Sequence, residues 1–466
     1  MKLSVLVNKD IKDDVEITGI KTNSKDIKKG DLFVCIKGAN TDRHDFIDDA
    51  VANGASAVIV SKNIKTTVPT VKVENTNESL KKLLDKFYDN PLKKLKVIGI
   101  TGTDGKTTSA KIVQELIGPD KCAYIGTLGV EYKDKHIKTN NTTPSLDVLF
   151  YYFDLLVKEN IEYLVMETSS EAFFYNRLDG IYFDIAGLTN ITSDHMNTHK
   201  TIKNYVECKK QLFINSDFQI INSNDAHFNE IKEVCKNFIT YGYDDSDNLK
   251  VISFTQNPNN TEIKLTFNNK EYIIKSSLLG RFNVENLVLA LLICDKLGFD
   301  INTLQDKTNT LSIKGRMQLL DFGQNFYCVI DYAHTINSIN TVLEFAKSLD
   351  IHKIITVTGQ AGGRDQTKRS LIGKIVLENS DYVILTSDDP RHEDPMNIIS
   401  QMLEGSNKKN YEIELDREKA IAKAVSMAKE NDMILALGKG ADLYQKVKDE
   451  TLYYSEEESF KKAFNK

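Results

Sequence analysis

The sequence predicts an α/β protein of three domains, of which the central one is a nucleotide-binding domain built on a parallel sheet. Its 466 residues correspond to about three domains at roughly 150 residues each. Short apolar runs alternate with helical stretches along most of the chain, the pattern of a parallel sheet with helices on both faces. One such run leads into the segment Thr101-Gly-Thr-Asp-Gly-Lys-Thr-Thr, which is typical of a phosphate-binding loop.

Residues 1–92 are expected to form a small α/β domain. The segments 31–36 and 57–60 have the apolar character of buried strands, and the polar segment 75–89 is expected to be a helix. An Asn-Pro pair followed by a run of lysines then ends this pattern. Such a break in composition places the first domain boundary after residue 92.

Residues 93–314 and 315–466 are expected to be two larger doubly wound domains. In the first, a strand at 97–100 precedes the glycine-rich loop and the helix 107–117, whereas residues 250–275 interrupt the alternation and are expected to be antiparallel hairpins. The second is expected to be Rossmann-like, with buried strands at residues 329–331, 354–357, 382–385 and 433–436.

Composition excludes several classes of protein. With 60 basic and 66 acidic side chains the net charge is −6, which argues against a dedicated nucleic-acid binder. No run approaches the roughly 20 apolar residues that a membrane span requires. The six cysteines form no C-x-x-C pair, which favours a reducing compartment, the cytoplasm. We further expect a monomer.

The glycine-rich loop has the residues that bind a nucleoside triphosphate. Gly102 and Gly105 allow successive N–H groups to face phosphate oxygens, and the following helix adds its positive N-terminus. Lys106 can neutralise the β- and γ-phosphates, and Thr107 can place its hydroxyl on Mg²⁺. The loop is shorter than G-x-x-x-x-G-K-[ST], because Ile100 stands where that pattern has its first glycine. A chance glycine-rich turn is the alternative interpretation.

Two further polar residues follow predicted strands, at the sheet edge where α/β proteins bind ligands. Glu167 comes soon after the strand 163–165 and offers a carboxylate for Mg²⁺, although the run 168–171 also suits a helix N-cap. His195 lies in a segment that follows another strand. Taken alone, a histidine in such a place is more often structural than a metal ligand.

Together these motifs resemble the Mur ligase family, ATP-dependent amide-forming enzymes of peptidoglycan synthesis, and within it the MurE-type UDP-N-acetylmuramoyl-tripeptide synthetases. Residues 101–108 match the family loop T-G-T-x-G-K-T-T, with Asp104 in place of the usual Asn. Residues 331–335 match its D-Y-A-H-T motif, and residues 280–286 match G-x-F-N-x-x-N. The resemblance covers nearly the whole chain. It implies domains that bind the uridine nucleotide, ATP and the amino acid, in that order.

The resemblance implies ATP, Mg²⁺ and a carbamylated lysine. ATP is expected on Gly102, Thr103, Asp104, Gly105, Lys106, Thr107, Thr108, Asn286, Arg316, Asp331 and His334. Mg²⁺ is expected on Thr107, Glu167, His195 and Lys209. Lys209 has the K-x-x-L-F spacing of the family's carbamylated lysine, whose modification replaces a cation by an anion. Catalysis is expected from Lys106, Lys209 and His195.

Two more substrates are implied by the resemblance. UDP-N-acetylmuramoyl-L-alanyl-D-glutamate is expected on Ser24, Thr142, Thr143, Ser169 and Arg177. The uridine signature departs from the family's Asp-Ser-Arg at Asn23 and Lys25, and Glu171 stands where a His is usual. A free diamino acid is expected on Arg364, Asp388, Asp389, Arg391, Gly438 and Asp442.

The sequence leaves the identity of the diamino acid open. Arg391 could pair with the distal carboxylate of meso-diaminopimelate. Asp389, where the family has Asn, could instead neutralise Arg391 and leave an acidic pocket for the single ammonium of L-lysine. This departure, together with Asp442 in place of Glu, favours lysine, and ornithine is a third candidate. Arg391 could alternatively form a surface salt bridge with Glu393 or Asp394.

The implied reaction has two steps. The γ-phosphoryl group of ATP moves to the D-glutamate carboxylate, and the incoming amine then displaces phosphate from the acyl phosphate. Folylpolyglutamate synthetase is the nearest rival, but its loop usually reads G-K-G-S and it lacks a uridine-binding domain. Another Mur-type ligase and a P-loop ATPase that acts on a partner are the remaining alternatives.

Overall fold

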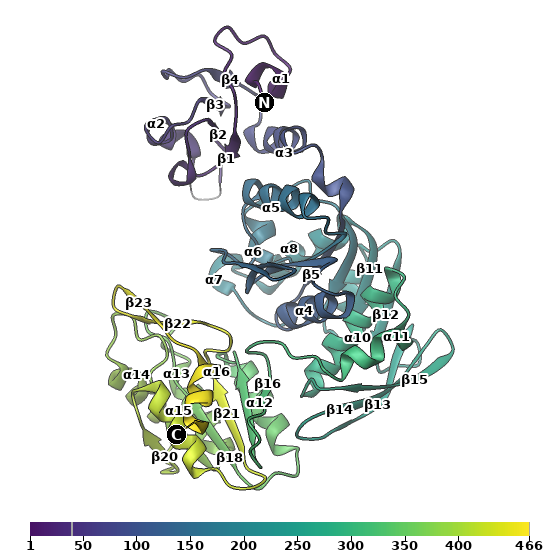
Figure 1. Ribbon diagram of the computed structural model, residues 1–466, viewed down its shortest axis with the longest axis vertical. Helices are drawn as coiled ribbons and strands as arrows, with labels where there is room; N and C mark the ends of the chain where they lie inside the picture. Colours follow the sequence, from purple (N-terminus) through teal and green to yellow (C-terminus); the bar gives the residue numbers. More distant parts are fainter. Residues whose placement is uncertain (39–40, 466) are drawn as a thin grey trace. The chain divides into compact units, whose positions relative to one another are not determined.

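Tertiary contacts in the computed structural model divide the chain into two compact units (Figure 1). The structure describes residues 1–38 and 41–465. The first unit contains residues 1–241 and 289–298, and the second contains the rest. The division into three domains at residues 92 and 314 stays a prediction, and residues 39, 40 and 466 of the predicted ranges lie outside the described residues.

The first unit begins with a four-stranded parallel sheet and three helices. The strands in spatial order are β1 (Gly19–Lys21), β2 (Asp31–Val34), β3 (Ala57–Val60) and β4 (Thr70–Lys72). The helices are α1 (Leu3–Val7), α2 (Ile47–Ala52) and α3 (Thr76–Phe87). Every residue of β2 and β3 is buried, as expected for inner parallel strands. The strands and the helix predicted for this region are confirmed.

A second parallel sheet forms the centre of the first unit. Its strands in spatial order are β12 (Phe238–Gly242), β11 (Ser216–Asn222), β10 (Phe183–Leu188), β5 (Lys96–Thr101), β9 (Tyr163–Glu167) and β6 (Cys122–Gly126), followed by the antiparallel β7 (Gly129–Tyr132) and β8 (Lys135–Ile137). The register pairs Ile98 with Val165 of β9 and with Ile185 of β10, so β5 lies inside the sheet.

Helices cover both faces of this sheet because the strand side chains alternate between the two faces. Val97 belongs to the core formed with Phe150 of α5 and Leu212 of α8, so Ile98 points to the opposite face. Figure 1 shows α4 and α5 on opposite sides of β5. The helices are α4 (Lys106–Ile117), α5 (Leu146–Lys158), α6 (Ser170–Phe174), α7 (Met196–His199), α8 (Ile202–Ile214), α9 (Phe228–Lys232) and α10 (Arg281–Lys296).

The second unit contains an antiparallel meander, a six-stranded sheet and a hairpin. The meander is β13 (Leu249–Gln256), β14 (Thr261–Phe267) and β15 (Lys270–Ser276), which confirms the predicted hairpins. The sheet order is β16 (Gln318–Leu320), β17 (Tyr327–Asp331), β21 (Met433–Leu437), β18 (Ile354–Thr358), β19 (Tyr382–Leu385) and β20 (Tyr411–Ile413). The hairpin is β22 (Tyr444–Val447) and β23 (Glu450–Tyr453).

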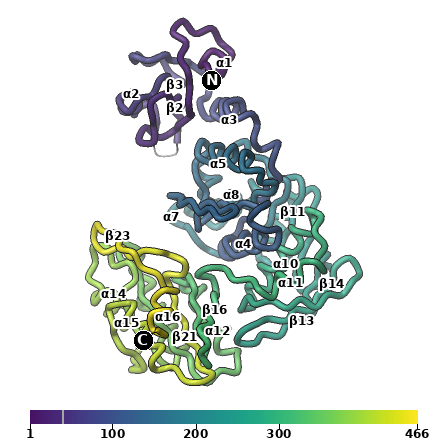
Figure 2. Tube along the Cα trace, in the orientation of Figure 1, coloured from purple at the N-terminus to yellow at the C-terminus, as the bar shows by residue number. Residues whose placement is uncertain are grey.

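Two helical layers enclose the six-stranded sheet. Alternate residues of β21 divide between two cores: Met433 and Leu435 pack with one set of helices, and Ile434 packs with the other. The first layer is α12 (Ile336–Lys347), α13 (Arg369–Asn379) and α14 (Pro395–Leu403), and the second is α15 (Arg417–Met427) and α16 (Glu456–Phe464). The remaining helix is α11 (Ile301–Thr308). The predicted Rossmann-like arrangement is confirmed, and Figure 2 traces its chain in green and yellow.

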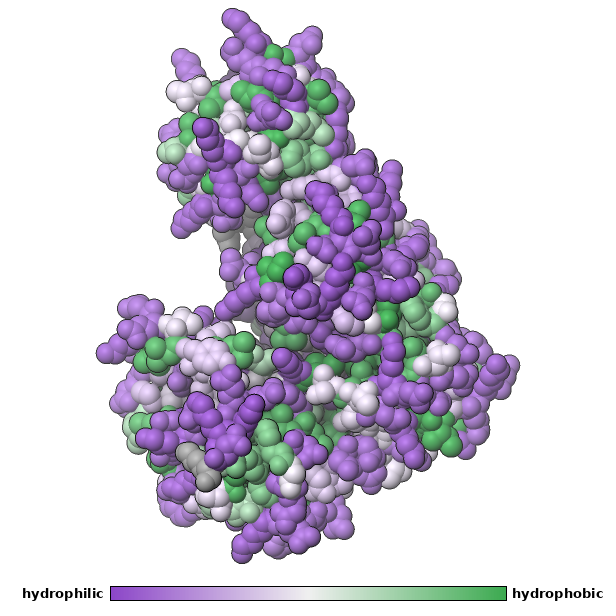
Figure 3. All heavy atoms as spheres, viewed as in Figure 1, coloured by the Kyte–Doolittle hydropathy of each residue, from purple (hydrophilic) through white to green (hydrophobic). Residues whose placement is uncertain are grey.

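Polar residues and short connections lie where the parallel strands end. Thr101 ends β5, Glu167 ends β9 and Asp331 ends β17, so the carboxyl edges of both sheets carry predicted site residues. No helix among the described residues is long and apolar enough to cross a bilayer. On the face drawn in Figure 3, hydrophilic residues predominate and hydrophobic ones occur in small groups.

Candidate active site

The phosphate loop between β5 and α4 has two positions that only glycine fits well. A Cβ on Gly102 would lie 1.8 Å from the hydroxyl oxygen of Thr189, so the backbone approaches this neighbour too closely for a side chain. Gly105 precedes α4 with a φ of 81°, in the left-handed region. The backbone carbonyl of the neighbouring loop residue Asp104 accepts a hydrogen bond from the Thr189 hydroxyl at 2.6 Å. Thr108 lies buried in the first turn of α4.

Two lysine amines meet at one carbonyl of this loop. Lys106 Nζ donates to the carbonyls of Gly102 at 2.9 Å and Thr103 at 2.7 Å. Lys209, on α8 and 1% exposed, donates to the same Gly102 carbonyl at 2.6 Å. Burial, reinforced by the positive charge of Lys106, lowers the pKa of Lys209 well below its ordinary value. The amine of Lys209 is therefore neutral over a wider pH range than that of an exposed lysine.

Glu167 is a fully buried carboxylate that receives hydrogen bonds from three residues. The hydroxyl of Thr107 lies 2.9 Å and 3.0 Å from its two oxygens. The backbone N–H of Thr127 donates at 2.8 Å, and the hydroxyl of Tyr124 also donates. Thr107 and Glu167, both predicted as Mg²⁺ ligands, are thus in direct contact. Tyr124 and Thr127 were not among the predicted site residues. The available signal was the buried strand β6, which contains Tyr124 and ends just before Thr127.

Four predicted substrate residues gather around Glu167. The hydroxyl of Thr143 donates to the Glu167 carbonyl at 2.8 Å and accepts from the Ser169 N–H at 3.2 Å. Arg177 Nη1 donates to the Thr143 carbonyl at 3.2 Å. The hydroxyl of Thr142 lies 3.2 Å from the hydroxyl of Thr127, the residue whose backbone N–H donates to the Glu167 carboxylate. Ser169 also caps α6 by accepting from Ala172 N at 3.2 Å, so the capping interpretation of residues 168–171 is confirmed.

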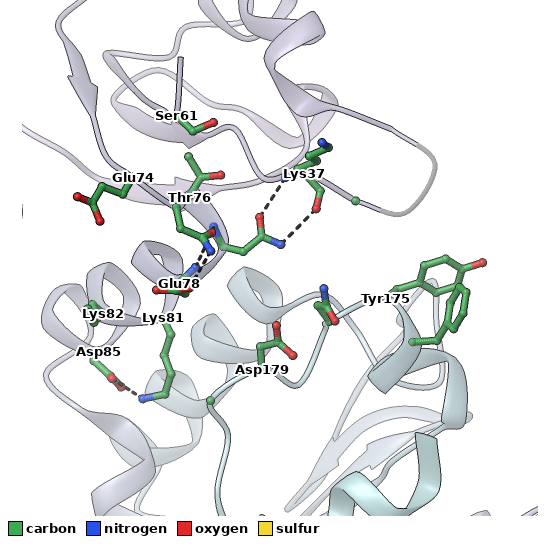
Figure 4. A pocket seen from close by; sticks show the side chains of 16 residues that line it. Lys37, Ser61, Glu74, Thr76, Glu78, Lys81, Lys82, Asp85, Tyr175 and Asp179 are labelled. Carbon is green, nitrogen blue, oxygen red and sulfur yellow. Dashed lines mark hydrogen bonds and ion pairs between the residues drawn. The ribbon is translucent and has the colours of Figure 1, made fainter. Parts of the chain in front are cut away.

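Ser24 lies in the N-terminal part of the unit, buried at the start of a 3₁₀ turn. Its carbonyl accepts from the side chain of Asn53 at 3.0 Å, and Asn23 caps the turn. A cavity of about 1100 Å³ opens in the same unit. In Figure 4, Lys37 and Thr76 line one side of this cavity and Asp179 and Tyr175 the other. Ser24 is not among the residues that line it.

His195 has different neighbours from those predicted. Its Nε2 lies 3.4 Å from Asp194 and its Nδ1 lies 3.8 Å from Glu171, whose carboxylate also accepts from Thr198 at 3.0 Å. The imidazole is 45% exposed and the residue has a left-handed φ of 54°. Within the described part of the chain, no group of three or more His, Cys, Asp or Glu residues is arranged to hold a metal. The Mg²⁺ set that includes His195 and Lys209 stays a prediction.

The predicted nucleotide residues of the second unit surround the end of β17. The Asp331 carboxylate accepts from the backbone of Met317 at 2.7 Å. The Arg316 guanidinium lies 4.5 Å from the ring centroid of Tyr332, and His334 Nδ1 lies 2.8 Å from the Tyr332 carbonyl. These three predicted residues are therefore neighbours along one strand end.

Asn286 lies on the first turns of α10. Its amide donates to Asn283 at 3.0 Å, and Asn283 donates to the Leu279 carbonyl at 2.8 Å. Both asparagines are buried, so the pair fixes the start of the helix.

The predicted neutralisation of Arg391 by Asp389 is wrong. Asp389 accepts instead from Lys439 at 2.8 Å, and both side chains are buried. Lys439 Nζ also lies 4.0 Å from Asp388, and a Cβ on Gly438 would approach Asp388 to 2.7 Å. The acidic pair is thus held by a buried lysine fifty positions further along the chain. Lys439 was not among the predicted residues, although it lies inside the G-K-G motif.

Arg391 does not form the alternative surface salt bridge either. Glu393 pairs with Arg369 at 2.7 Å, which lowers the pKa of Glu393 to about 2, and Asp394 caps α14. Among residues 1–38 and 41–465 Arg391 has no ion pair, and its Nε is buried without a hydrogen-bond partner. Arg364 is exposed. Burial raises the pKa of Asp442, the last predicted residue of this group.

Three family models of the Mur ligases match the chain. The Mur ligase family catalytic domain matches residues 16–88, the Mur ligase middle domain matches residues 100–294, and the Mur ligase glutamate ligase domain matches residues 315–440.

Similar proteins are known as sequences and as structures. A UDP-N-acetylmuramoyl-L-alanyl-D-glutamate–2,6-diaminopimelate ligase of Bacillus cereus is 35% identical, with 97% of this chain and 95% of the relative aligned. A ligase of the same name from Clostridium acetobutylicum is 37% identical over 95% of this chain and 94% of the relative. A solved structure of such a ligase has a TM-score of 0.72 at 27% identity and covers 100% of this chain and 99% of its own.

Proposed function

The chain belongs to the Mur ligase family, and from this premise we propose that it joins meso-diaminopimelate to the D-glutamate of UDP-N-acetylmuramoyl-L-alanyl-D-glutamate. The enzyme is an ATP-dependent amide ligase of peptidoglycan synthesis. One observation supports the proposal above the others: hydrogen bonds run from the phosphate loop through Thr107 and Glu167 to Thr143 and Arg177. The γ-phosphate and the accepting carboxylate would therefore be bound side by side. The proposal places a monomeric enzyme in the cytoplasm.

The first step transfers the γ-phosphoryl group of ATP to a carboxylate oxygen of D-glutamate and releases ADP. Such a transfer needs positioning and charge neutralisation more than covalent help from the protein. Lys106 would leave the loop carbonyls and bind the transferred phosphate. Arg177 would bind the dipeptide end of the precursor. In the second step the neutral amine attacks the acyl carbon, phosphate leaves, and the amine gives up a proton.

The pair Thr107 and Glu167 fits Mg²⁺. A hydroxyl and an ionised carboxylate are hard oxygen donors of the kind that Mg²⁺ prefers beside nucleotide phosphates. When bound, the ion would neutralise charge that develops on the phosphoryl group. Thr107 and Glu167 are the residues that would hold it, and Tyr124 and Thr127 fix the orientation of the carboxylate.

Lys209 supports the proposal of a carbamate. Carbon dioxide reacts with the neutral form of an amine, forming an N–C bond and releasing one proton. Burial and the neighbouring Lys106 favour this neutral form. The resulting anion would face the ammonium of Lys106 at the Gly102 carbonyl, and the two charges would attract each other.

The choice of meso-diaminopimelate over L-lysine rests on Arg391. The preference for lysine required Asp389 to neutralise this guanidinium, but Asp389 is paired with Lys439. Among the described residues Arg391 has no ion pair, so its charge is available to a second carboxylate of the substrate. The names of the relatives in Bacillus cereus and Clostridium acetobutylicum favour the same amino acid. Lysine and ornithine each have only one carboxylate, which must remain at the reacting end.

The test is amine-dependent release of phosphate. The purified protein is supplied with ATP, Mg²⁺ and UDP-N-acetylmuramoyl-L-alanyl-D-glutamate, and phosphate is measured with meso-diaminopimelate, L-lysine, ornithine or no amine. We expect release with meso-diaminopimelate to exceed that with the other two amines by at least about 100-fold in kcat/KM. Phosphate release that does not depend on an added amine would refute the ligase reaction. A preference for lysine would refute the proposal that Arg391 binds a second carboxylate of the substrate.

A further inference from the structure

Tyr205, on α8, touches three parts of the candidate active site. The residue is 1% exposed. Its hydroxyl lies 3.0 Å from the hydroxyl of Thr103 in the phosphate loop. Its ring centroid lies 4.4 Å from Lys209 Nζ and 5.2 Å from the ring of His199. A single side chain is therefore packed against the loop, the lysine and the α7 segment.

The hydrogen bond between Tyr205 and Thr103 has a defined direction. The Thr103 hydroxyl donates to the Thr192 carbonyl at 3.1 Å and accepts from the Thr192 N–H at 2.9 Å. A hydroxyl has one hydrogen and two lone pairs. Because that hydrogen is already used, the Tyr205 hydroxyl donates to the second lone pair of Thr103. The phosphate loop is thereby tied to α8.

The ring of Tyr205 makes a separate contact with the amine of Lys209. The buried amine is held between the face of the ring and the Gly102 carbonyl, which lies 2.6 Å away. An aromatic face attracts a cation and also gives a neutral amine an apolar support. Loss of the ring would remove one of these two contacts of Lys209 and leave space in which the amine could move.

The ring of Tyr205 also packs against a buried histidine. His199 is 1% exposed, and its Nε2 lies 3.0 Å from the hydroxyl of Ser170, next to the predicted substrate residue Ser169. The rings of His199 and Tyr205 meet edge to face at an angle of 63°. This packing restricts the orientation of the Tyr205 ring.

We propose that Tyr205 is a positioning residue that holds the phosphate loop through its hydroxyl and the Lys209 head group through its ring. The inference rests on the proposed function, since that function gives Lys209 its role. Because the two contacts belong to different atoms, two substitutions separate them. Tyr205→Phe removes the bond to Thr103 and keeps the ring, whereas Tyr205→Leu removes both.

The experiment compares these variants with Tyr241→Phe, a matched control. Tyr241 is also 1% exposed, and its hydroxyl donates to the Leu188 carbonyl at 2.9 Å. Nucleotide affinity is measured with a fluorescent ATP analogue, and kcat and KM for ATP are measured by phosphate release. Carbamate on Lys209 is measured as the ¹³C resonance that labelled bicarbonate introduces, and thermal unfolding shows that each variant folds.

We expect Tyr205→Phe to weaken nucleotide binding and raise the KM for ATP about fivefold, with kcat within twofold of wild type. Tyr205→Leu should also lower kcat by about 100-fold and lose the carbamate signal. Tyr241→Phe should match wild type in nucleotide affinity, kcat, KM for ATP and carbamate signal. Nucleotide affinity of Tyr205→Phe equal to that of Tyr241→Phe would overturn the role of the hydroxyl. A wild-type kcat and carbamate signal in folded Tyr205→Leu would overturn the role of the ring. A wild-type protein that binds the nucleotide but carries no carbamate would instead count against the proposed function.

Discussion

The charged side chains at the phosphate loop of the first unit and at the loop 388–391 of the second differ in whether they have bonding partners within the protein. In the first, Lys106 and Lys209 share the Gly102 carbonyl, and Glu167 receives three donors. In the second, Asp389 is paired inside the protein, but among the described residues Arg391 has no ion pair. One region meets its ligand with its polar groups already bonded, and the other leaves a guanidinium to be bonded by the ligand.

Under the proposed function, the difference follows from the ligand that each region would recognise. Phosphoryl transfer is the same for every acceptor, so its residues can be fixed in advance by internal hydrogen bonds. The choice of an amino acid depends on a group that only the correct substrate carries, and an unpaired buried donor penalises the substrate that lacks it. Substitutions in the first region should therefore abolish turnover, and loss of Arg391 in the second should change the preferred amino acid.

The largest effect is expected at Lys209. Lys209→Ala should lower kcat by about 10³-fold, because the amine and the carbamate proposed to form on it are both lost. Short-chain carboxylates added to the assay should restore part of the activity by taking the place of the carbamate. The neighbour Lys210, which pairs with Glu207 at 2.9 Å, provides the control, and Lys210→Ala should retain wild-type kcat. Full activity of Lys209→Ala would contradict this role of the first region.

Glu167→Gln should lower kcat by about 100-fold and raise the Mg²⁺ concentration that gives half-maximal rate. The amide keeps the shape of the side chain but lacks the negative charge, and its NH₂ group faces donors rather than acceptors. The control is Glu162→Gln on the same segment, where the carboxylate forms an exposed pair with Lys121 at 3.3 Å. Equal Mg²⁺ dependence in the two variants would exclude Glu167 from the metal site.

Arg391→Ala should raise the KM for meso-diaminopimelate by about 50-fold, the loss expected for a charge-assisted bond to a carboxylate. The KM for L-lysine should change less than about threefold, since lysine has no distal carboxylate. The comparison is made by steady-state phosphate release with both amines. A parallel rise for lysine would show that Arg391 acts on the pocket as a whole.

Asp389→Asn tests whether the internally paired Asp389 has a different role from Arg391, which has no ion pair among the described residues. Because Asp389 pairs with the buried Lys439, its loss leaves a buried ammonium with a weaker partner and should lower thermal stability. The preference between meso-diaminopimelate and lysine should stay the same. A switch from lysine to meso-diaminopimelate in this variant would restore the hypothesis that Asp389 neutralises Arg391.

The smallest effect is expected at Glu393, which holds the segment beside Arg391. Arg369 and the Gly363 N–H lower the pKa of Glu393 from its ordinary value of 4.5 to about 2. Stabilisation by the ionised carboxylate is therefore present above about pH 4.5 and is lost as the pH falls towards 2. Glu393→Gln should cost about 1 kcal/mol at pH 7.

Urea unfolding at pH 7 and pH 3 measures this loss, and the difference between Glu393→Gln and wild type should shrink at pH 3. The exposed Glu404 offers a matched control, since its substitution by Gln should have no effect at either pH. A difference that is independent of pH would show that the ion pair with Arg369 is not its source.

Local motifs made much of the fold and the first region predictable. The strands 97–100 and 163–166 are continuous apolar runs, and the phosphate loop consists of consecutive residues, so both can be recognised without knowing the rest of the chain. The hairpin of β22 and β23 was not predicted. Its residues are all exposed or half-buried, so no alternation of polar and apolar residues marks it.

By itself the sequence determined the family, the order of the motifs and the residues of the phosphate loop, because these depend on neighbours in the chain. Only the tertiary structure decided the partners of the charged groups. Asp389 lies two positions from Arg391, yet it bonds to Lys439 and to the backbone of Lys446 in the unpredicted hairpin. Lys209 reaches a carbonyl 107 positions away. A buried charge binds whichever opposite charge or dipole the packing brings within about 3 Å, and sequence distance has no influence on that choice.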